Sequence, residues 1–339
     1  MPNPPTELAA PTEPGGEHFA APVVPRAPAG KPRGMSYVDS LTPELFVPTA
    51  ARPVRAKLRW LAADGRATEA TYADLRLATN RFANALDALG VAAGERVFTM
   101  LPRRRELYET AVGTWKHRSV FAPLFSAFGP EPAFQRLHKG DGRVLVTTPA
   151  LHERRIAPIR SRLPGLEHVL LTGAPDGSAP VGTAWYDEVV GAQADGFAIA
   201  DTDPEDVALL HFTSGTTGMP KGALHVHQAV VAHQASGYSA LDLHPDDVYW
   251  CTADPGWVTG TSYGIIAPLV HGVTSVVDDA AFARVYDGVA PALERYLVRR
   301  VRDRALVDLV GGLRDAEEDR GQAPGCPGGA GVPLDWWGW

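Results

Sequence analysis

The pattern of hydrophobic and polar positions becomes regular near Leu58 and predicts a long helix first. Thr71 and Asp74 resemble a capping box, in which a hydroxyl and a later acidic side chain satisfy the free amides of a helix start. Apolar residues then recur at helical spacing, at Leu75, Ala78, Phe82, Leu86 and Leu89. Gly90 follows, at the position where a glycine ends many helices.

After this helix, short apolar runs alternate with amphipathic stretches of helical period. The runs predict strands at 96–101, 119–124, 143–148 and 168–172, and the stretches predict helices at 103–117, 130–139 and 150–163. Beyond a polar stretch, further strands are expected near 207–212, 223–226, 248–252 and 273–277. Strands joined by helices of this length are typical of βαβ units. The sequence therefore predicts an α/β fold with two mostly parallel sheets flanked by helices.

The same pattern divides the chain into four regions, at 1–57, 58–200, 201–284 and 285–339. The first is expected to be mobile or irregular, because its first part is rich in proline, glycine, alanine and glutamate without an apolar period. The second and third are expected to be α/β subdomains with one sheet each. The fourth is expected to form a helix followed by irregular chain, because the glycine- and proline-rich sequence after Gly311 has no core-forming pattern.

Composition and charge narrow the classes of function. The chain has 339 residues, of which 45% are hydrophobic and 21% charged, as in an average globular protein. Its net charge of -7 argues against nucleic-acid or acidic-membrane partners, which require a basic excess. No apolar run is long enough to cross a bilayer, and the first residues lack the pattern of a signal peptide. Cys251 and Cys326 have no metal-like spacing and indicate free thiols of a cytoplasmic protein.

The segment with the most specific chemistry directly follows the strand expected at 207–212. It reads Thr213-Ser214-Gly215-Thr216-Thr217-Gly218-Met219-Pro220-Lys221-Gly222. Its glycines let the backbone approach an anion closely, and its amides, hydroxyls and lysine ammonium are donors for phosphate oxygens. A polar turn without function is the plainer interpretation. The segment is not a Walker A loop, because Pro220 precedes Lys221 and Gly222 follows it, so a P-loop nucleotide hydrolase is disfavoured.

These ten residues resemble the phosphate loop of the adenylate-forming enzymes, which include acyl-CoA synthetases, luciferases and nonribosomal adenylation domains. A second segment resembles the acyl-pocket region of AMP-forming acetyl-CoA synthetases, and it reads Tyr249-Trp250-Cys251-Thr252-Ala253-Asp254-Pro255-Gly256-Trp257-Val258-Thr259-Gly260-Thr261-Ser262-Tyr263-Gly264. Further similar segments include Asn80-Arg81-Phe82-Ala83-Asn84 and Pro123-Leu124-Phe125-Ser126-Ala127-Phe128-Gly129-Pro130-Glu131. The resemblance covers roughly two thirds of the chain and implies the N-terminal part of such an enzyme.

The resemblance implies a role for each matched residue. The β- and γ-phosphates of ATP are assigned to Thr213, Ser214, Gly215, Thr216, Thr217, Gly218 and Lys221. Of these, Lys221 is also the expected catalytic residue. The acyl pocket is assigned to Trp257, Val258 and Thr259, where a β-branched pair beside an indole leaves little room for the acid. The alternative is that Trp257 and Val258 are ordinary core residues at a helix start.

Two other clusters have weaker interpretations. Arg103 and Arg104 either contact the phosphates of CoA or belong to a solvated basic face. His225 and His227 project from one face of a strand, but no third ligand lies nearby in the sequence, so we expect no metal site. Residues 115–119 depart from the family by placing basic side chains where it usually has small ones.

The resemblance implies a two-step ligase reaction with ATP, Mg²⁺ and CoA. A carboxylate attacks the α-phosphate of ATP to give an acyl-adenylate and pyrophosphate, and the CoA thiol then displaces AMP. The only partners expected are these small molecules and acetate or another short acid.

Two family features are missing from the 339 residues. They contain no Tyr-Gly-x-Thr-Glu segment, which the family uses for adenine and magnesium, and no match to its C-terminal domain with an active lysine. We therefore expect an acetate–CoA ligase by ancestry that is truncated and inactive as given. A shift of the reading frame is the preferred explanation for the sequence after about residue 300. The alternatives are a catalytically dead fragment and a non-enzymatic interaction module.

Overall fold

The structure is a computed structural model that describes residues 57–62, 66–173, 177–213 and 219–278. These residues divide between two compact units. The larger unit contains the described residues of 57–59 and 69–276, and the smaller contains 60–62, 66–68 and 277–278. The candidate site lies entirely in the larger unit. The expected tail and nearly all of the expected N-terminal region lie outside the described residues.

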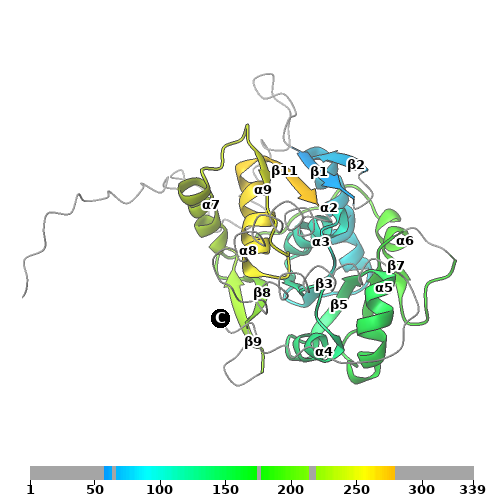
Figure 1. The fold of residues 1–339 in the computed structure, drawn as a ribbon. Coiled ribbons are helices and arrows are strands. Elements are labelled where there is room, and N and C mark those ends of the chain that lie inside the picture. The colour runs from blue at the N-terminus through cyan, green and yellow to red at the C-terminus, as the bar shows by residue number, and fades with distance from the viewer. Residues whose placement is uncertain (1–56, 63–65, 174–176, 214–218, 279–339) are drawn as a thin grey trace, which may run out of the picture. The chain divides into compact units, whose positions relative to one another are not determined.

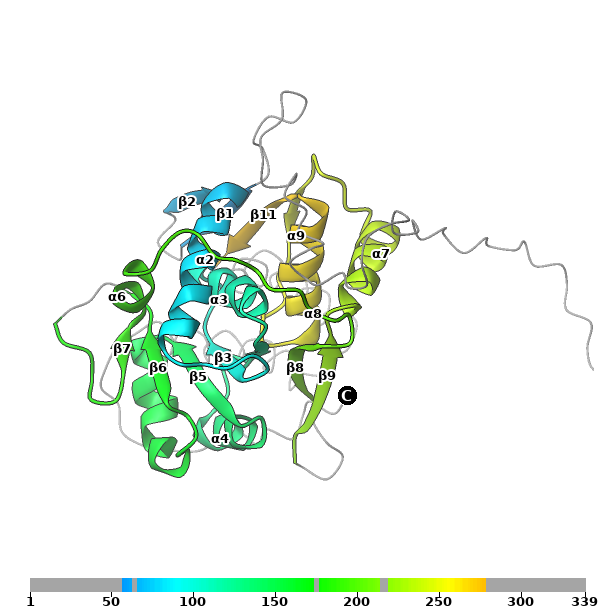
Figure 2. The same ribbon diagram turned by 180° about the vertical axis from the view of Figure 1, so that it is seen from behind.

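The larger sheet has its seven strands in the order β7-β6-β5-β3-β4-β8-β9 (Figures 1 and 2). The strands are β3 (Arg96–Met100), β4 (Val120–Pro123), β5 (Gly142–Thr147), β6 (His168–Leu171), β7 (Ala184–Trp185), β8 (Val207–Thr213) and β9 (Lys221–Val226). Neighbouring strands are parallel, except that β8 and β9 are antiparallel. The expectation of a mostly parallel α/β sheet is confirmed.

Three helices lie where the hydrophobic period predicts them, and they are α2 (Tyr72–Ala88), α3 (Arg105–Lys116) and α4 (Pro130–Lys139). A short helix that was not predicted, α6 (Tyr186–Gly191), lies in the polar stretch between the two sets of expected strands. The expected capping box begins α2: Asp74 N–H donates to Thr71 Oγ1 at 3.1 Å, and Thr71 N–H donates to the Asp74 carboxylate at 2.8 Å. Gly90 then takes a φ of 71°, which glycine adopts without strain. In the described part of the chain, no helix has both the length and the apolarity needed to cross a membrane.

The helix expected at 150–163 is divided into three short pieces. These are α5 (Pro149–Leu151), the π-helical η1 (His152–Ile156) and the 3₁₀-helical η2 (Ala157–Arg162). Pro158 has no backbone N–H and cannot continue an α-helical ladder, which accounts for the change of helix type at this point.

Alternate residues of the central strands face opposite helical layers, as the pleat of a strand requires. Phe98 and Met100 of β3 belong to a buried cluster with residues of α4, η1 and η2. On the other face, Trp115 of α3 meets Phe121 of β4 edge-on, with ring centroids 5.7 Å apart. Figure 1 shows α2 and α3 on one side of β3 and α4 on the other. The strands are buried on both faces, which explains their continuous apolar runs.

A second sheet has the order β10-β11-β1-β2. Its strands are β1 (Lys57–Leu61), β2 (Ala67–Thr71), β10 (Val248–Trp250) and β11 (Thr274–Asp278). Between β9 and β11 the chain forms α7 (Ala229–Leu241), α8 (Val258–Thr261), the π-helical η3 (Ser262–Ile266) and α9 (Ala267–His271). The Tyr72 hydroxyl at the start of α2 donates to Val273 O, just before β11, at 2.8 Å.

The strands that share a sheet differ from the expectation. The sequence predicts β8 and β9 in the second sheet, and this assignment is wrong, because β8 pairs with β4 with Phe121 opposite Leu209. The Trp115 indole supports the pairing by donating to Ala208 O at 2.9 Å. Since β4 is buried on both faces, its backbone groups need a strand on each side. The division into two subdomains stays a prediction.

Candidate functional site

The hydroxyl- and glycine-rich segment joins β8 to β9. Thr213 ends β8, Lys221 begins β9, and the two residues are opposite each other in the antiparallel ladder. Both are exposed. The segment therefore joins two neighbouring strands of the larger sheet. The other expected phosphate ligands lie outside the described residues: Ser214, Gly215, Thr216, Thr217 and Gly218.

The chain just before Lys221 is held by the helix next to it. Pro220 is buried, and its carbonyl accepts a hydrogen bond from Lys139 Nζ at 2.9 Å. After Lys221, a Cβ at Gly222 would lie 3.1 Å from Leu210 Cδ1, so a larger residue would press against β8. The backbone that carries Lys221 is therefore tied to Lys139 on one side and packs closely against β8 on the other.

The sheet topology places these strand ends at a point where open α/β sheets bind ligands. β3, β4 and β8 are parallel neighbours, so their carboxyl ends lie along one edge. The connection after β4 returns across β3 to β5, whereas the connection after β8 leads outward to β9. The two connections diverge between β4 and β8, and such divergence marks the ligand site of this architecture.

Trp257, Val258 and Thr259 lie at the start of α8, next to the chain that leaves β4. The Trp257 ring is 5.6 Å from the ring of Phe125, two residues after β4. Trp257 is 55% exposed and Val258 42%, and Thr259 is exposed as well, which does not fit ordinary core residues. The structure thus brings Trp257 to the loop after β4, and β4 is the neighbour of the strand that ends at Thr213.

Two glycines allow the chain around α8 to close tightly. A Cβ at Gly256 would lie 2.2 Å from the backbone nitrogen of Phe125, and a Cβ at Gly260 would lie 1.9 Å from the carbonyl oxygen of Asp254. Backbone meets backbone at both places, so any side chain would force the main chain apart. The Thr261 hydroxyl completes the closure by donating to Pro255 O at 2.6 Å.

Arg103 and Arg104 follow β3 at the same edge, and both are engaged within the chain. The Arg103 guanidinium donates to the carbonyl of Thr252. Arg104 forms an ion pair with Glu106 at 3.0 Å. Contact of either side chain with CoA stays a prediction, and it requires that an existing contact be shared or released.

His225 lies on β9, and His227 follows the end of that strand. The His225 ring meets His211 edge-on at a centroid distance of 5.9 Å, and His227 is buried. Burial lowers the pKa of His211 to about 4, with His225 and His233 adding to the shift, so its imidazole is neutral at neutral pH. Among the residues with described positions, no group of three or more His, Cys, Asp or Glu side chains is arranged to hold a metal.

No pattern in the sequence indicates a role for the residues that hold Trp257 in place. Ser126 Oγ donates to Asp254 Oδ2 at 3.2 Å, and Phe125 supports the indole. Ser126 and Asp254 are 128 positions apart, and no period or spacing indicates a contact between two such loops. One local signal is present, since glycines around Asp254 are typical of a close backbone approach.

The open, mostly parallel sheet, with the segment after β8 at its carboxyl edge, defines the class of α/β proteins with nucleotide-binding topology. Within this class the chain belongs to the AMP-binding enzyme family, whose model matches residues 49–296. The family expected from the phosphate segment is confirmed.

Relatives in this family include acetyl-coenzyme A synthetases. The one from Bacillus subtilis (strain 168) is 43% identical over 216 residues, covering 63% of this chain and 37% of the relative. The one from Methanothrix thermoacetophila is 34% identical over 223 residues, covering 62% and 34%. The chain spans about a third of the length of these relatives.

Solved structures show the same relationship. The crystal structure of Brucella canis acyl-CoA synthetase matches with a TM-score of 0.67 and 30% identity, over 78% of this chain and 47% of that chain. An anthranilate CoA ligase in complex with anthranoyl-AMP matches with a TM-score of 0.67 and 28% identity, over 78% and 49%. The fold is therefore shared with acyl-CoA ligases, and the similarity supports descent from them.

Proposed function

We propose that this chain supplies the part of an acetate–CoA ligase that holds the phosphates of ATP and a short acid during adenylate formation. The observation that carries the proposal is the pairing of Thr213 with Lys221 at the edge of the sheet where Trp257 also lies. Acetate and CoA as substrates follow from the names of the relatives. A cytoplasmic location and the absence of nucleic-acid and membrane partners stay predictions from composition.

The phosphate half of the proposal rests on fixed donors. Negative charge on the phosphates must be stabilised while the carboxylate attacks the α-phosphate and pyrophosphate leaves. Donors held by a strand ladder need no reorganisation for this, and the compact ammonium of Lys221 suits a phosphate oxygen. Mg²⁺ bound with the nucleotide would neutralise part of that charge. The described residues offer the ion no cluster of acidic ligands, so this chain's own contribution is the lysine, the hydroxyls and the backbone amides.

The acyl half rests on the exposed start of α8. Val258 and the Trp257 indole give a narrow apolar surface, and the Thr259 hydroxyl is a donor for a carboxylate. A short acid seated there would present its carboxylate toward the neighbouring strand ends that carry the phosphate segment. The second step, displacement of AMP by the CoA thiol, is assigned only Arg103 and Arg104 as possible phosphate contacts.

Calorimetric titration of the 339-residue chain with ATP and with tripolyphosphate tests the proposal. Lys221→Ala is expected to weaken tripolyphosphate binding about ten- to a hundredfold, the usual effect of losing one charge-assisted hydrogen bond. Lys57→Ala is the matched control, because it also removes a lysine charge at a strand start, where the ammonium pairs with Glu69 at 2.6 Å. Equal binding by all three proteins contradicts the proposal.

A further inference from the structure

We propose that Asp254 is a positioning residue of the acyl site, whose carboxylate ties the start of α8 to the loop after β4 and thereby fixes Trp257. The identity of the ligand in this inference rests on the proposed function. The contacts of Asp254 do not.

Asp254 contacts both the chain that leads into α8 and the loop after β4. Its Oδ1 accepts the Gly256 N–H at 2.8 Å, and its Oδ2 accepts the Ser126 hydroxyl at 3.2 Å. Its backbone carbonyl accepts the N–H of Trp257 at 3.0 Å. A single residue therefore holds the amide before the indole, the amide of the indole residue itself, and the opposite loop.

The surroundings of the Asp254 carboxylate favour these contacts. Burial raises the pKa of its carboxyl group, while the Gly256 amide, the charge of Arg103 and the Ser126 hydroxyl act in the opposite direction. A carboxylate that is partly removed from water is tolerated when its oxygens have donors, and here each oxygen has one. At Gly256 and Gly260, moreover, the backbone packs so closely against other backbone that a side chain would not fit.

The consequence for Trp257 is a fixed orientation despite its exposure. Its ring rests on Phe125 with an interplanar angle of 55°. An indole that is 55% exposed has few other contacts to hold it, so the backbone on its N-terminal side determines where it lies. Loss of the Asp254 ties is expected to free the indole and enlarge the space beside Val258.

Two substitutions separate geometry from charge. Asp254→Asn keeps an oxygen for the Gly256 amide and offers an N–H to the Ser126 hydroxyl, so it preserves both ties without the charge. Asp254→Ala removes both ties. A positioning role therefore predicts that asparagine restores what alanine loses. Asp246→Ala is the matched control, because it removes an exposed carboxylate from the same part of the chain.

The test uses the full 339-residue chain labelled with 5-fluorotryptophan, with the Trp257 signal assigned by Trp257→Phe. We expect Asp254→Ala to shift that signal and to accelerate amide exchange in residues 254–261 about ten- to a hundredfold, as loss of hydrogen bonds to a charged group implies. Asp254→Asn and Asp246→Ala are expected to match the parent chain. Asp254→Ala is also expected to lose the response of the Trp257 signal to acetate while it keeps tripolyphosphate binding.

Each other outcome is decisive. An unchanged Trp257 signal and unchanged exchange in Asp254→Ala overturn the inference, as does an asparagine variant as disturbed as the alanine variant. If Asp254→Ala does not fold, Ser126→Ala replaces it, with a smaller change expected in the same direction and no change overturning the inference. If the Trp257 signal of the parent chain does not respond to acetate, the proposed acyl function fails, while amide exchange still decides the tie between Asp254 and Trp257.

Discussion

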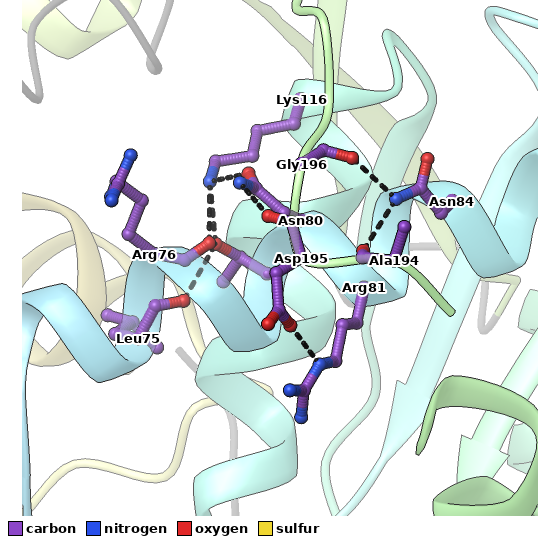
Figure 3. A network of polar contacts seen from close by, with 10 residues as sticks. Leu75, Arg76, Asn80, Arg81, Asn84, Lys116, Ala194, Asp195 and Gly196 are labelled. Atoms are coloured by element: carbon purple, nitrogen blue, oxygen red, sulfur yellow. Dashed lines mark hydrogen bonds and ion pairs between the residues drawn. The ribbon is translucent and has the colours of Figure 1, made fainter. Parts of the chain in front are cut away.

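Lys116 Nζ lies 2.6 Å from Asn80 Oδ1, at the interface of α3 and α2 (Figure 3). The same ammonium donates to Thr79 Oγ1 at 2.8 Å and to Arg76 O at 3.2 Å. Among the described residues no carboxylate pairs with it, and burial lowers its pKa to about 7. Asn80 continues the network by donating to Asp195 O at 2.7 Å, in the segment that follows α6. A buried lysine amine thus joins two helices through neutral acceptors.

The free energy of unfolding is therefore expected to rise from pH 7 to pH 9. In that range the unfolded chain keeps the proton on Lys116, whose usual pKa is 10.5, while the folded chain releases it. The gain is about 2–3 kcal/mol. Cys251, whose pKa burial raises above 9.0, acts in the opposite direction, but only from the upper end of this range. Urea unfolding at several pH values checks the slope, which Lys116→Met is expected to flatten and Lys57→Met to leave intact. A slope that persists in Lys116→Met contradicts the assignment.

Alanine at Gly256 or Gly260 is expected to destabilise the fold by about 2–3 kcal/mol. The new Cβ would clash with backbone atoms, which, unlike the end of a side chain, can move only if the main chain shifts. Gly264→Ala is the control. Its Cβ would lie 3.4 Å from Cys251 Sγ, an ordinary contact distance, so little change is expected. Urea denaturation compares the three variants. Equal stabilities would show that the chain around α8 relaxes more easily than its contacts imply.

Leu224 is expected to promote association of the chain with itself. It lies on β9, the last strand in the order of the larger sheet, and is 63% exposed. Leu224→Thr keeps a residue suited to a strand and is expected to reduce light scattering at high protein concentration. Its ladder partner Leu210 is 5% exposed, so Leu210→Thr should lower stability instead. Unchanged scattering in Leu224→Thr rules out this surface as the cause.

Local signals in the sequence predict α2, α3, α4 and most strands of the larger sheet, but they miss α6 and α7 (Ala229–Leu241). Strand partners and contacts between loops depend on distant segments and are not predicted. The Thr71–Asp74 capping box and the glycine at position 90 mark the ends of α2 without reference to any other part of the chain. The pairing of β8 with β4 is not predictable in this way. Both strands are apolar, and the hydrophobic period identifies a strand without specifying its partner. The phosphate segment is recognisable by residue type alone. The tie between Ser126 and Asp254 is not, because it exists only once two loops meet.

The ladder that places Thr213 opposite Lys221 also makes the segment between them exchangeable. Its two anchors stay neighbours whatever residues connect them, so a transplanted loop of another length would begin and end at the same points of the sheet. Each doubling of a flexible loop costs only about 0.6 kcal/mol in closure entropy. For protein engineering, the β8–β9 pair is therefore a site where anion-binding loops of different sequence and length can replace the present segment without a change to the sheet.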